Sequence, residues 1–193
     1  VADSLTGCGS GGAAQNYVGW YLFFHDLSRV KTMGVFAKLD GYSGQCPVSG
    51  FEDCIELLSC DLGIHKPGSA GARAGGGGAA IADDISLTID YEKSMPDIQS
   101  GLLEGKAIKK VELFFTATIN DNPNEIFLTY TFEDCHFTGF QISGQGSGSG
   151  EPPTVNISVS YTTVECNYVY FDEKGKKKNV PAAKFNVRTG EPG

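Results

Sequence analysis

Histidine, methionine, tryptophan and long apolar segments are all scarce in this sequence. Its 193 residues include 3 histidines, 2 methionines and 1 tryptophan. No stretch reaches the roughly 18–20 apolar residues that a membrane-spanning helix needs. The apolar run at 17–24 is far shorter, and it has neither a basic segment before it nor a small-residue cleavage site after it. We therefore expect no membrane insertion and no Sec signal peptide.

Positive charge is also in short supply. The chain has 15 Lys and Arg residues against 23 Asp and Glu, which gives a formal net charge of -8 at pH 7 and a pI of about 4.8. Phosphate contacts need concentrated Lys and Arg, so this balance argues against a nucleic-acid partner. The basic cluster at 174–178 contains a glycine and follows an aromatic run, a pattern typical of a solvated hairpin tip.

The motifs that usually mark an active site are absent. The sequence has no G-x-S-x-G or H-E-x-x-H pattern. Gly75-x-Gly77 precedes a strand pattern, whereas a dinucleotide fingerprint needs a strand before it and a helix after it. Cys135 and His65 could meet as thiolate and imidazolium, but no local pattern brings them together. We predict no catalytic residue, no cofactor and no enzyme activity.

The cysteines have spacings that fit no common metal site. They are Cys8, Cys46, Cys54, Cys60, Cys135 and Cys166. No pair has the C-x₂-C spacing of a zinc knuckle, and the adjacent Cys135 and His136 would face opposite sides of a strand. The acidic pairs 83–84 and 133–134, at predicted strand ends, face apart in the same way. We predict no metal site and expect free thiols, which pack as small hydrophobic groups.

Glycine is abundant by contrast. The chain has 26 glycines, roughly twice the usual share of about 7%. The composition of the first residues favours a flexible N-terminal arm over 1–32, followed by a folded domain over 33–173. Two glycine-rich loops, 66–79 and 143–153, are long enough to be either functional or disordered. Residues 174–193 are predicted to form a basic turn and a C-terminal tail with a candidate last strand.

A period of two dominates the sequence from Met33 onward. Apolar and polar residues alternate in the manner of half-buried strands with one wet face. The candidate strands cover 35–39, 54–64, 85–92, 111–119, 126–132, 155–161 and 168–171. Closely spaced strands of this kind predict a mainly β antiparallel fold, either a sandwich or a closed barrel.

One helix is predicted between these strands. Ser94 is a candidate N-cap, Pro96 follows it, and Asp97 completes a start that resembles a capping box. Gly105 suits a left-handed C-terminal position, while Gly101 within the helix costs about 1 kcal/mol relative to alanine. The residues that share one helical face are Met95, Ile98, Leu102 and Leu103. We expect this face to pack on the sheet, because a helix of this length is marginal alone.

The order of these features resembles the Hcp family, the haemolysin-coregulated tube proteins of bacterial type VI secretion. The resemblance spans about residues 33–173, and the ordered series is more specific than any single motif. The matching segments are FAKLDG at 36–41, FEDCIELLSCDLG at 51–63, DDISLTIDYEKS at 83–94 with the helix and Gly105-Lys106, LTYTFED at 128–134, and the strands of 156–170. GQCP at 44–47 departs from the acidic stretch usual in the family.

The resemblance implies an antiparallel two-sheet β-barrel with one short α-helix packed at its side. It also implies a structural tube subunit: hexameric rings stack into a hollow tube that a contractile sheath expels and that can carry effectors in its lumen. The implied partners are further copies of the chain and the spike, sheath and effector proteins, with no nucleic acid. The implied location is the bacterial cytoplasm during assembly, followed by secretion through the type VI system without a Sec signal peptide.

The first glycine-rich loop is the candidate assembly site. It carries few charges, so it could lie flat across a neighbouring subunit or ring, although ordering it costs about 1–2 kcal/mol per residue. The candidate residues are Lys66, Pro67, Gly68, Ser69, Arg73, Gly75, Gly76, Gly77 and Gly78.

An alternative function stays open at this point: an exported monomeric β-sandwich that binds a carbohydrate or protein ligand. Three disulfides would favour that module, because exported domains form disulfides in an oxidising environment. Free thiols would favour the tube subunit.

Overall fold

The structure is a computed structural model, and it describes residues 33–65, 81–119, 122–144, 146, 148, 150–171 and 176–192. The predicted N-terminal arm 1–32 and all nine candidate assembly residues of the 66–79 loop lie outside the described residues. Part of the basic cluster 174–178 lies outside them as well.

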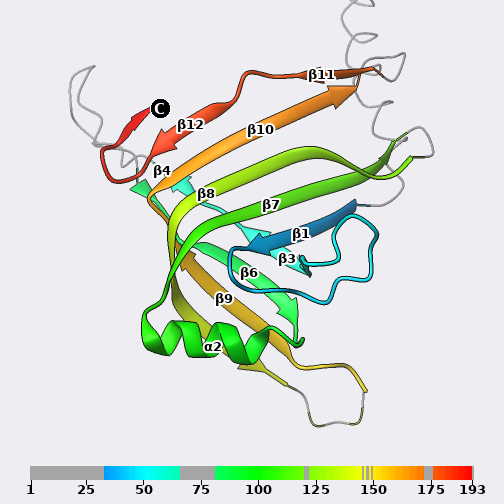
Figure 1. The fold of residues 1–193 in the computed structure, drawn as a ribbon, viewed down its shortest axis with the longest axis vertical. Helices are drawn as coiled ribbons and strands as arrows, with labels where there is room; N and C mark the ends of the chain where they lie inside the picture. The colour runs from blue at the N-terminus through cyan, green and yellow to red at the C-terminus, as the bar shows by residue number, and fades with distance from the viewer. Residues whose placement is uncertain are drawn as a thin grey trace, which may run out of the picture.

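The described chain is mainly β with one short helix (Figure 1). Its strands are β1 Met33–Leu39, β2 Ile55–Glu56, β3 Ser59–Asp61, β4 Ile64–His65, β5 Ile81–Ala82, β6 Ile85–Asp90, β7 Ala107–Ile119, β8 Asn122–Ser143, β9 Thr154–Ser160, β10 Thr163–Phe171, β11 Lys177–Asn179, β12 Ala183–Asn186 and β13 Glu191–Pro192. The helix α2 spans Met95–Glu104. Apolar–polar alternation therefore predicted β1, β6, β7 and β9 closely, whereas the candidate strand 54–64 is divided among β2, β3 and β4, and the second half of β8 and the first half of β10 were not predicted.

Eleven of these strands form a single large antiparallel sheet. Its main order is β13-β12-β10-β8-β7-β1-β2, with β11 beside β10. A second branch leaves β8 and runs through β9 and β6 to β3. Strands β4 and β5 pair separately as a two-stranded sheet. The two branches lie at different angles in Figure 1, and the long strand β8 belongs to both.

The 22-residue strand β8 joins the two branches by bending. Its first half pairs with β7 and β10, and its second half pairs with β9. Asp134, between the halves, has a φ of 53°, in the left-handed region that short Asp side chains tolerate. The sequence-based placement of 133–134 at a strand end is wrong, because the strand turns at this point and continues.

The segment that contains β2 and β3 touches both branches at the opposite side of the sheet. The Leu57 N–H donates to the Val35 carbonyl of β1 at 2.9 Å, and the Leu58 N–H donates to the Thr88 carbonyl of β6 at 2.8 Å. Strand pairing among the described residues gives a large antiparallel sheet and no closed barrel. The predicted fold is thus confirmed in its mainly β, antiparallel character and its one short helix, and the closed barrel is not.

The main core lies between the branches, where alternate strand residues face inward. In β6, Ile85, Leu87 and Ile89 are fully or almost fully buried, while the residues between them are half-buried. Strand β9 repeats the pattern with Val155, Ile157 and Val159. These side chains pair directly across the two strands. Burying a side chain of this size stabilises the fold by about 1.5–3 kcal/mol relative to leaving it exposed.

Helix α2 packs against β8 (Figure 1). Met95 and Ile98 are buried as predicted, but Leu103 is 81% exposed, so its placement on the packed face is wrong. Gly105 has a φ of 67° and ends the helix as predicted. Ser94 is the N-cap residue, yet its side chain does not cap the helix; its hydroxyl donates to Glu92 instead.

Candidate functional site

The described part of the chain holds no cluster of metal-binding side chains. No group of three or more His, Cys, Asp or Glu residues within it could hold an ion. None of its helices has the length and apolar character needed to cross a membrane. Cys46, Cys54, Cys60, Cys135 and Cys166 are all free thiols. Cys8 lies outside the described residues.

Cys135 and His65, the pair considered as nucleophile and base, occupy very different settings. Cys135 is fully buried in β8, and burial raises the pKa of its thiol from 9.0 to about 12. The side chain of His65 is 56% exposed in β4, with Nδ1 3.6 Å from Oδ1 of Asp83. A buried, protonated thiol is a poor nucleophile, so Cys135 acts as a packing residue.

The ends of the candidate assembly loop are held together by β4 and β5. Ile64 pairs with Ala82, and His65 pairs with Ile81, in antiparallel register. Residues 66–80 therefore leave and re-enter the described structure at one place. Ile64 and Ile81 are 52% and 46% exposed, so the base of the loop presents apolar side chains to solvent.

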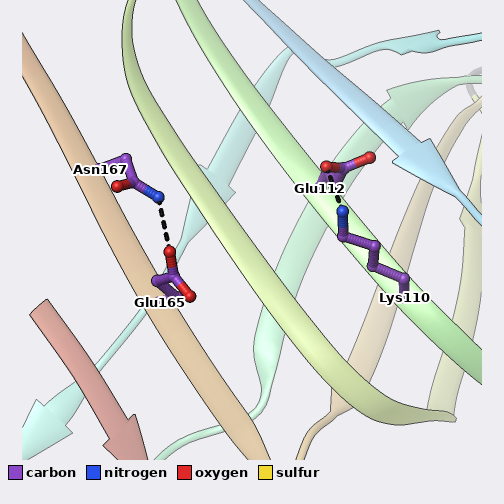
Figure 2. Close-up of polar contacts among 4 residues, drawn as sticks. All are labelled: Lys110, Glu112, Glu165 and Asn167. Atoms are coloured by element: carbon purple, nitrogen blue, oxygen red, sulfur yellow. Dashed lines mark hydrogen bonds and ion pairs between the residues drawn. The ribbon is translucent and has the colours of Figure 1, made fainter. Parts of the chain in front are cut away.

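A polar face covers the outer side of the branch formed by β7, β8 and β10. Figure 2 shows two of its contacts, one on each side of β8. On β7, Lys110 Nζ lies 2.7 Å from Glu112 Oε1, and on β10 the Asn167 amide donates to Glu165 Oε1 at 3.0 Å. Lys184 of β12 extends the face, 3.9 Å from a carboxylate oxygen of Glu165. Exposed pairs of this kind each stabilise the fold by only about 0–1 kcal/mol. Their main effect is to make this face polar and hydrated.

The opposite side of the same strands is apolar. Cross-strand neighbours there include Val111, Phe132 and Val164, which are nearly or fully buried. One side of this branch thus faces the core and the other faces water, as expected for an antiparallel sheet.

A cavity of about 510 Å³ lies where the 40–54 loop meets β6 and the segment before α2. Its lining residues are Gln45, Cys46, Pro47, Glu56, Leu57, Leu58, Ile89, Asp90, Tyr91, Glu92 and Pro152. Three of them are acidic and none is basic. The cavity is therefore a poor site for an anionic ligand, because it offers no cation to pair with a negative charge.

Glu92 joins the walls of this cavity. It is 9% exposed, and its carboxylate accepts hydrogen bonds from the Gln45 N–H at 2.9 Å and from the Ser94 hydroxyl. The Glu92 carbonyl also accepts from the Met95 N–H at 3.1 Å. Sequence reasoning missed this residue because a single glutamate before a helix has no distinguishing pattern.

A small second core lies on the other side of the 40–54 loop. Phe36, Cys46, Phe51 and Cys54 are each at most 7% exposed and pack together. The rings of Phe36 and Phe51 are stacked with centroids 4.3 Å apart. Sequence reasoning considered Cys46 and Cys54 as metal ligands by their spacing, but it did not predict that the fold brings them together.

These observations describe a mainly β protein with two apolar cores and one polar sheet face, and with no cluster of metal-binding side chains in the part of the chain that the structure describes. The family model for the type VI secretion system effector Hcp matches residues 36–168. The chain belongs to the Hcp family, whose members are non-enzymatic structural proteins of type VI secretion. No curated protein sequence matches it significantly.

Solved structures show the same fold. A type six secretion system protein has 21% identity and a TM-score of 0.75, with 84% of this chain and 100% of that chain covered. Hcp1 from Salmonella typhimurium has 23% identity and a TM-score of 0.65, with 83% and 98% covered. A type VI secretion system effector from Yersinia pestis has 22% identity and a TM-score of 0.60, with 79% and 99% covered.

Proposed function

We propose that this chain is a structural tube subunit of a type VI secretion system. In this account six copies form a ring, rings stack into a hollow tube, and a contractile sheath expels the tube with effectors in its lumen. The observation that carries the proposal is the match to the Hcp family over residues 36–168, within a fold of the same kind. The other partners are the spike and sheath proteins. Assembly takes place in the bacterial cytoplasm, before secretion.

The sheet closes on itself as a barrel in this proposal. Two observations support closure: β8 bends from one branch into the other, and Leu57 and Leu58 donate hydrogen bonds to both branches on the opposite side. The path β1-β7-β8-β9-β6 then returns to β1 through the 55–61 segment. A closed barrel leaves few free strand edges, and its outer surface is available for neighbouring subunits.

The folded unit in this proposal runs from 33 to 173, with 174–193 as a basic turn and tail that adds a last strand. Strand β12 pairs with β10 over four residues, which supports the last strand. A ring is built from heterologous contacts, in which two different surfaces of each subunit meet. The polar face of β7, β8 and β10 suits a wall in contact with water.

The candidate assembly loop contacts the next subunit or ring in this proposal. Its residues are Lys66, Pro67, Gly68, Ser69, Arg73, Gly75, Gly76, Gly77 and Gly78. The exposed Ile64 and Ile81 at its base support the proposal, because a partner that covered either one would remove apolar surface from water. They lie on opposite faces of the β4–β5 pair, since Ile64 pairs with Ala82 and Ile81 pairs with His65.

Light scattering of the purified full chain, combined with a loop deletion, tests both parts. We expect a particle about six times the 20.5 kDa mass of one chain. Deleting 70–78 should leave the ring or its stacks impaired while circular dichroism stays that of a folded β protein. A deletion variant that still forms stacked rings would contradict the role of the loop, and a wild-type monomer at high concentration would contradict the tube subunit.

A further inference from the structure

Cys46 and Cys54 lie next to each other although seven residues separate them in the sequence. The Cys46 N–H donates a hydrogen bond to the Cys54 carbonyl at 3.2 Å, and the Gly44 N–H donates to the Asp53 carbonyl at 3.1 Å. These two hydrogen bonds hold the backbone of 44–46 against that of 53–54, in a loop that belongs to no strand pair. A disulfide needs Cα atoms about 4.4–6.8 Å apart, a separation that a direct N–H to carbonyl contact between the two cysteines brings within reach.

The two side chains also share one environment. Both belong to the small core with Phe36 and Phe51, at 5% and 4% exposure. Their side chains therefore turn toward the same side of the loop, as a disulfide requires. Burial raises the pKa of both thiols, and the neighbouring Cys46 adds to the rise at Cys54. Both thiols are consequently protonated near neutral pH, which slows oxidation without preventing it.

A small oxidant has a route to this pair. Cys46 is one of the residues that line the cavity beside Glu92, and Gln45 and Pro47 flank it there. The cavity volume of about 510 Å³ is within the range of sites that admit small molecules. Cys54 lies behind Cys46 in the small core and is not a lining residue. Cys46 is thus the thiol that an incoming reagent meets first.

We propose that Cys46 and Cys54 form an intramolecular disulfide when the protein meets a small disulfide oxidant. The Cys46 thiolate attacks one sulfur of the oxidant RS–SR, and one RS⁻ leaves and takes up a proton. The Cys54 thiolate then attacks the Cys46 sulfur, and the second RS⁻ leaves and is protonated. Two protein thiols lose two electrons, and one RS–SR becomes two RSH. The proposal does not depend on assembly into rings.

Oxidation closes a nine-residue loop, 46–54, that carries the wall between the cavity and the small core. Closing a loop of that size reduces the conformational entropy of the unfolded chain. This should raise the Tm by about 5–10 °C for a domain of this size. The protein thus gains a covalent staple only after leaving a reducing compartment.

The test is oxidation of the full chain with bis(hydroxyethyl) disulfide, a small uncharged disulfide that the acidic cavity does not repel, followed by N-ethylmaleimide in denaturant and peptide mass spectrometry. We expect a peptide pair linked through Cys46 and Cys54, and a Tm increase of about 5–10 °C that dithiothreitol reverses. Cys46→Ser should abolish the linked pair, and Cys166→Ser should retain it.

Three results would overturn the proposal: both thiols stay labelled by maleimide, each ends as a separate mixed disulfide with the reagent, or Cys46 links to a different cysteine. The wild-type peptide map decides among them even where a serine variant fails to fold.

Discussion

Gly44 occupies a position where the backbone has no room for a side chain. A Cβ atom there would lie 2.0 Å from the Cys54 carbonyl oxygen and 2.7 Å from the Ile55 nitrogen. Both are backbone atoms, so they can yield only if the loop moves away from β2. Gly44→Ala should lower the free energy of unfolding by about 1–3 kcal/mol, measured as a lower urea midpoint.

Gly146 supplies the matched control for this substitution. Nothing lies within 4 Å of the position of its Cβ atom, and its φ is not in the left-handed region. Gly146→Ala should leave the urea midpoint within the error of the wild type. Equal midpoints for the Gly44 variant and the wild type would show that the loop does not pack on Cys54.

Cys135 should make the stability of the protein depend on pH in the alkaline range. Its pKa is raised from 9.0 to about 12 by burial, with a smaller contribution from Asp134. Above pH 9 the unfolded chain releases this proton while the folded chain retains it until about pH 12. The free energy of unfolding therefore falls between these values, by up to about 1.4 kcal/mol per pH unit for one proton.

Cys135→Ala removes this contribution. We expect urea unfolding of the wild type to lose stability more steeply than the variant between pH 9 and pH 11. Below pH 8 the two proteins should respond to pH in parallel, although the variant is less stable throughout because of the cavity it leaves. Parallel curves over the whole range would mean that the thiol ionises as easily in the folded chain as in the unfolded one.

At the scale of elements, the close packing of helix α2 on Tyr42 explains why the helix contains Gly101. A Cβ atom at Gly101 would lie 2.1 Å from the hydroxyl oxygen of Tyr42. The Tyr42 ring packs edge-on against Phe137 of β8 with centroids 5.3 Å apart, and its buried hydroxyl has no hydrogen-bond partner. The glycine thus lowers helix propensity but lets the helix approach the loop and the sheet.

A double-mutant cycle tests this contact. Gly101→Ala should destabilise the protein by about 1–3 kcal/mol, because the steric cost of the clash with Tyr42 exceeds the approximately 1 kcal/mol that alanine gains in helix propensity. Tyr42→Phe should be close to neutral because the hydroxyl it removes is unpaired. The double variant should recover most of the loss in urea unfolding. If the two effects simply add, helix and tyrosine are not in contact.

The strands and the helix could be predicted because each follows a local pattern. Residues 85–92 and 155–161 alternate cleanly, and β6 and β9 appear there. The bend of β8 at Asp134 was missed although the alternation breaks there, since the two exposed residues Glu133 and Asp134 separate the buried Phe132 from the buried Cys135. Leu103 was misplaced because the buried helix face is centred on Ile98 and Gly101, and at 3.6 residues per turn Leu103 lies on the opposite side of the helix.

The candidate site shows the same division. The sequence shows only that seven residues separate Cys46 from Cys54, a spacing that fits no zinc knuckle. Their proximity results from a loop that folds back onto β2. Glu92 likewise links the two walls of the cavity only because the fold places the Gln45 N–H, 47 residues away in the sequence, next to its carboxylate. Non-local contacts of this kind depend on the whole fold, and no local pattern records them.

At the scale of the whole molecule, three features support the proposal that this chain acts through contacts between copies. The chain belongs to the Hcp family. One side of its β7-β8-β10 branch faces water, and the exposed Ile64 and Ile81 lie at the base of the 66–80 segment. Each feature fits a subunit whose function is assembly, and the free thiols of the described residues are available to the staple proposed above.

Negative-stain electron microscopy of the full chain at high concentration tests whether the chain assembles into a tube. We expect rings with six-fold symmetry and a central hole, together with short stacks seen from the side. A field of small, solid particles of single-chain size would contradict it.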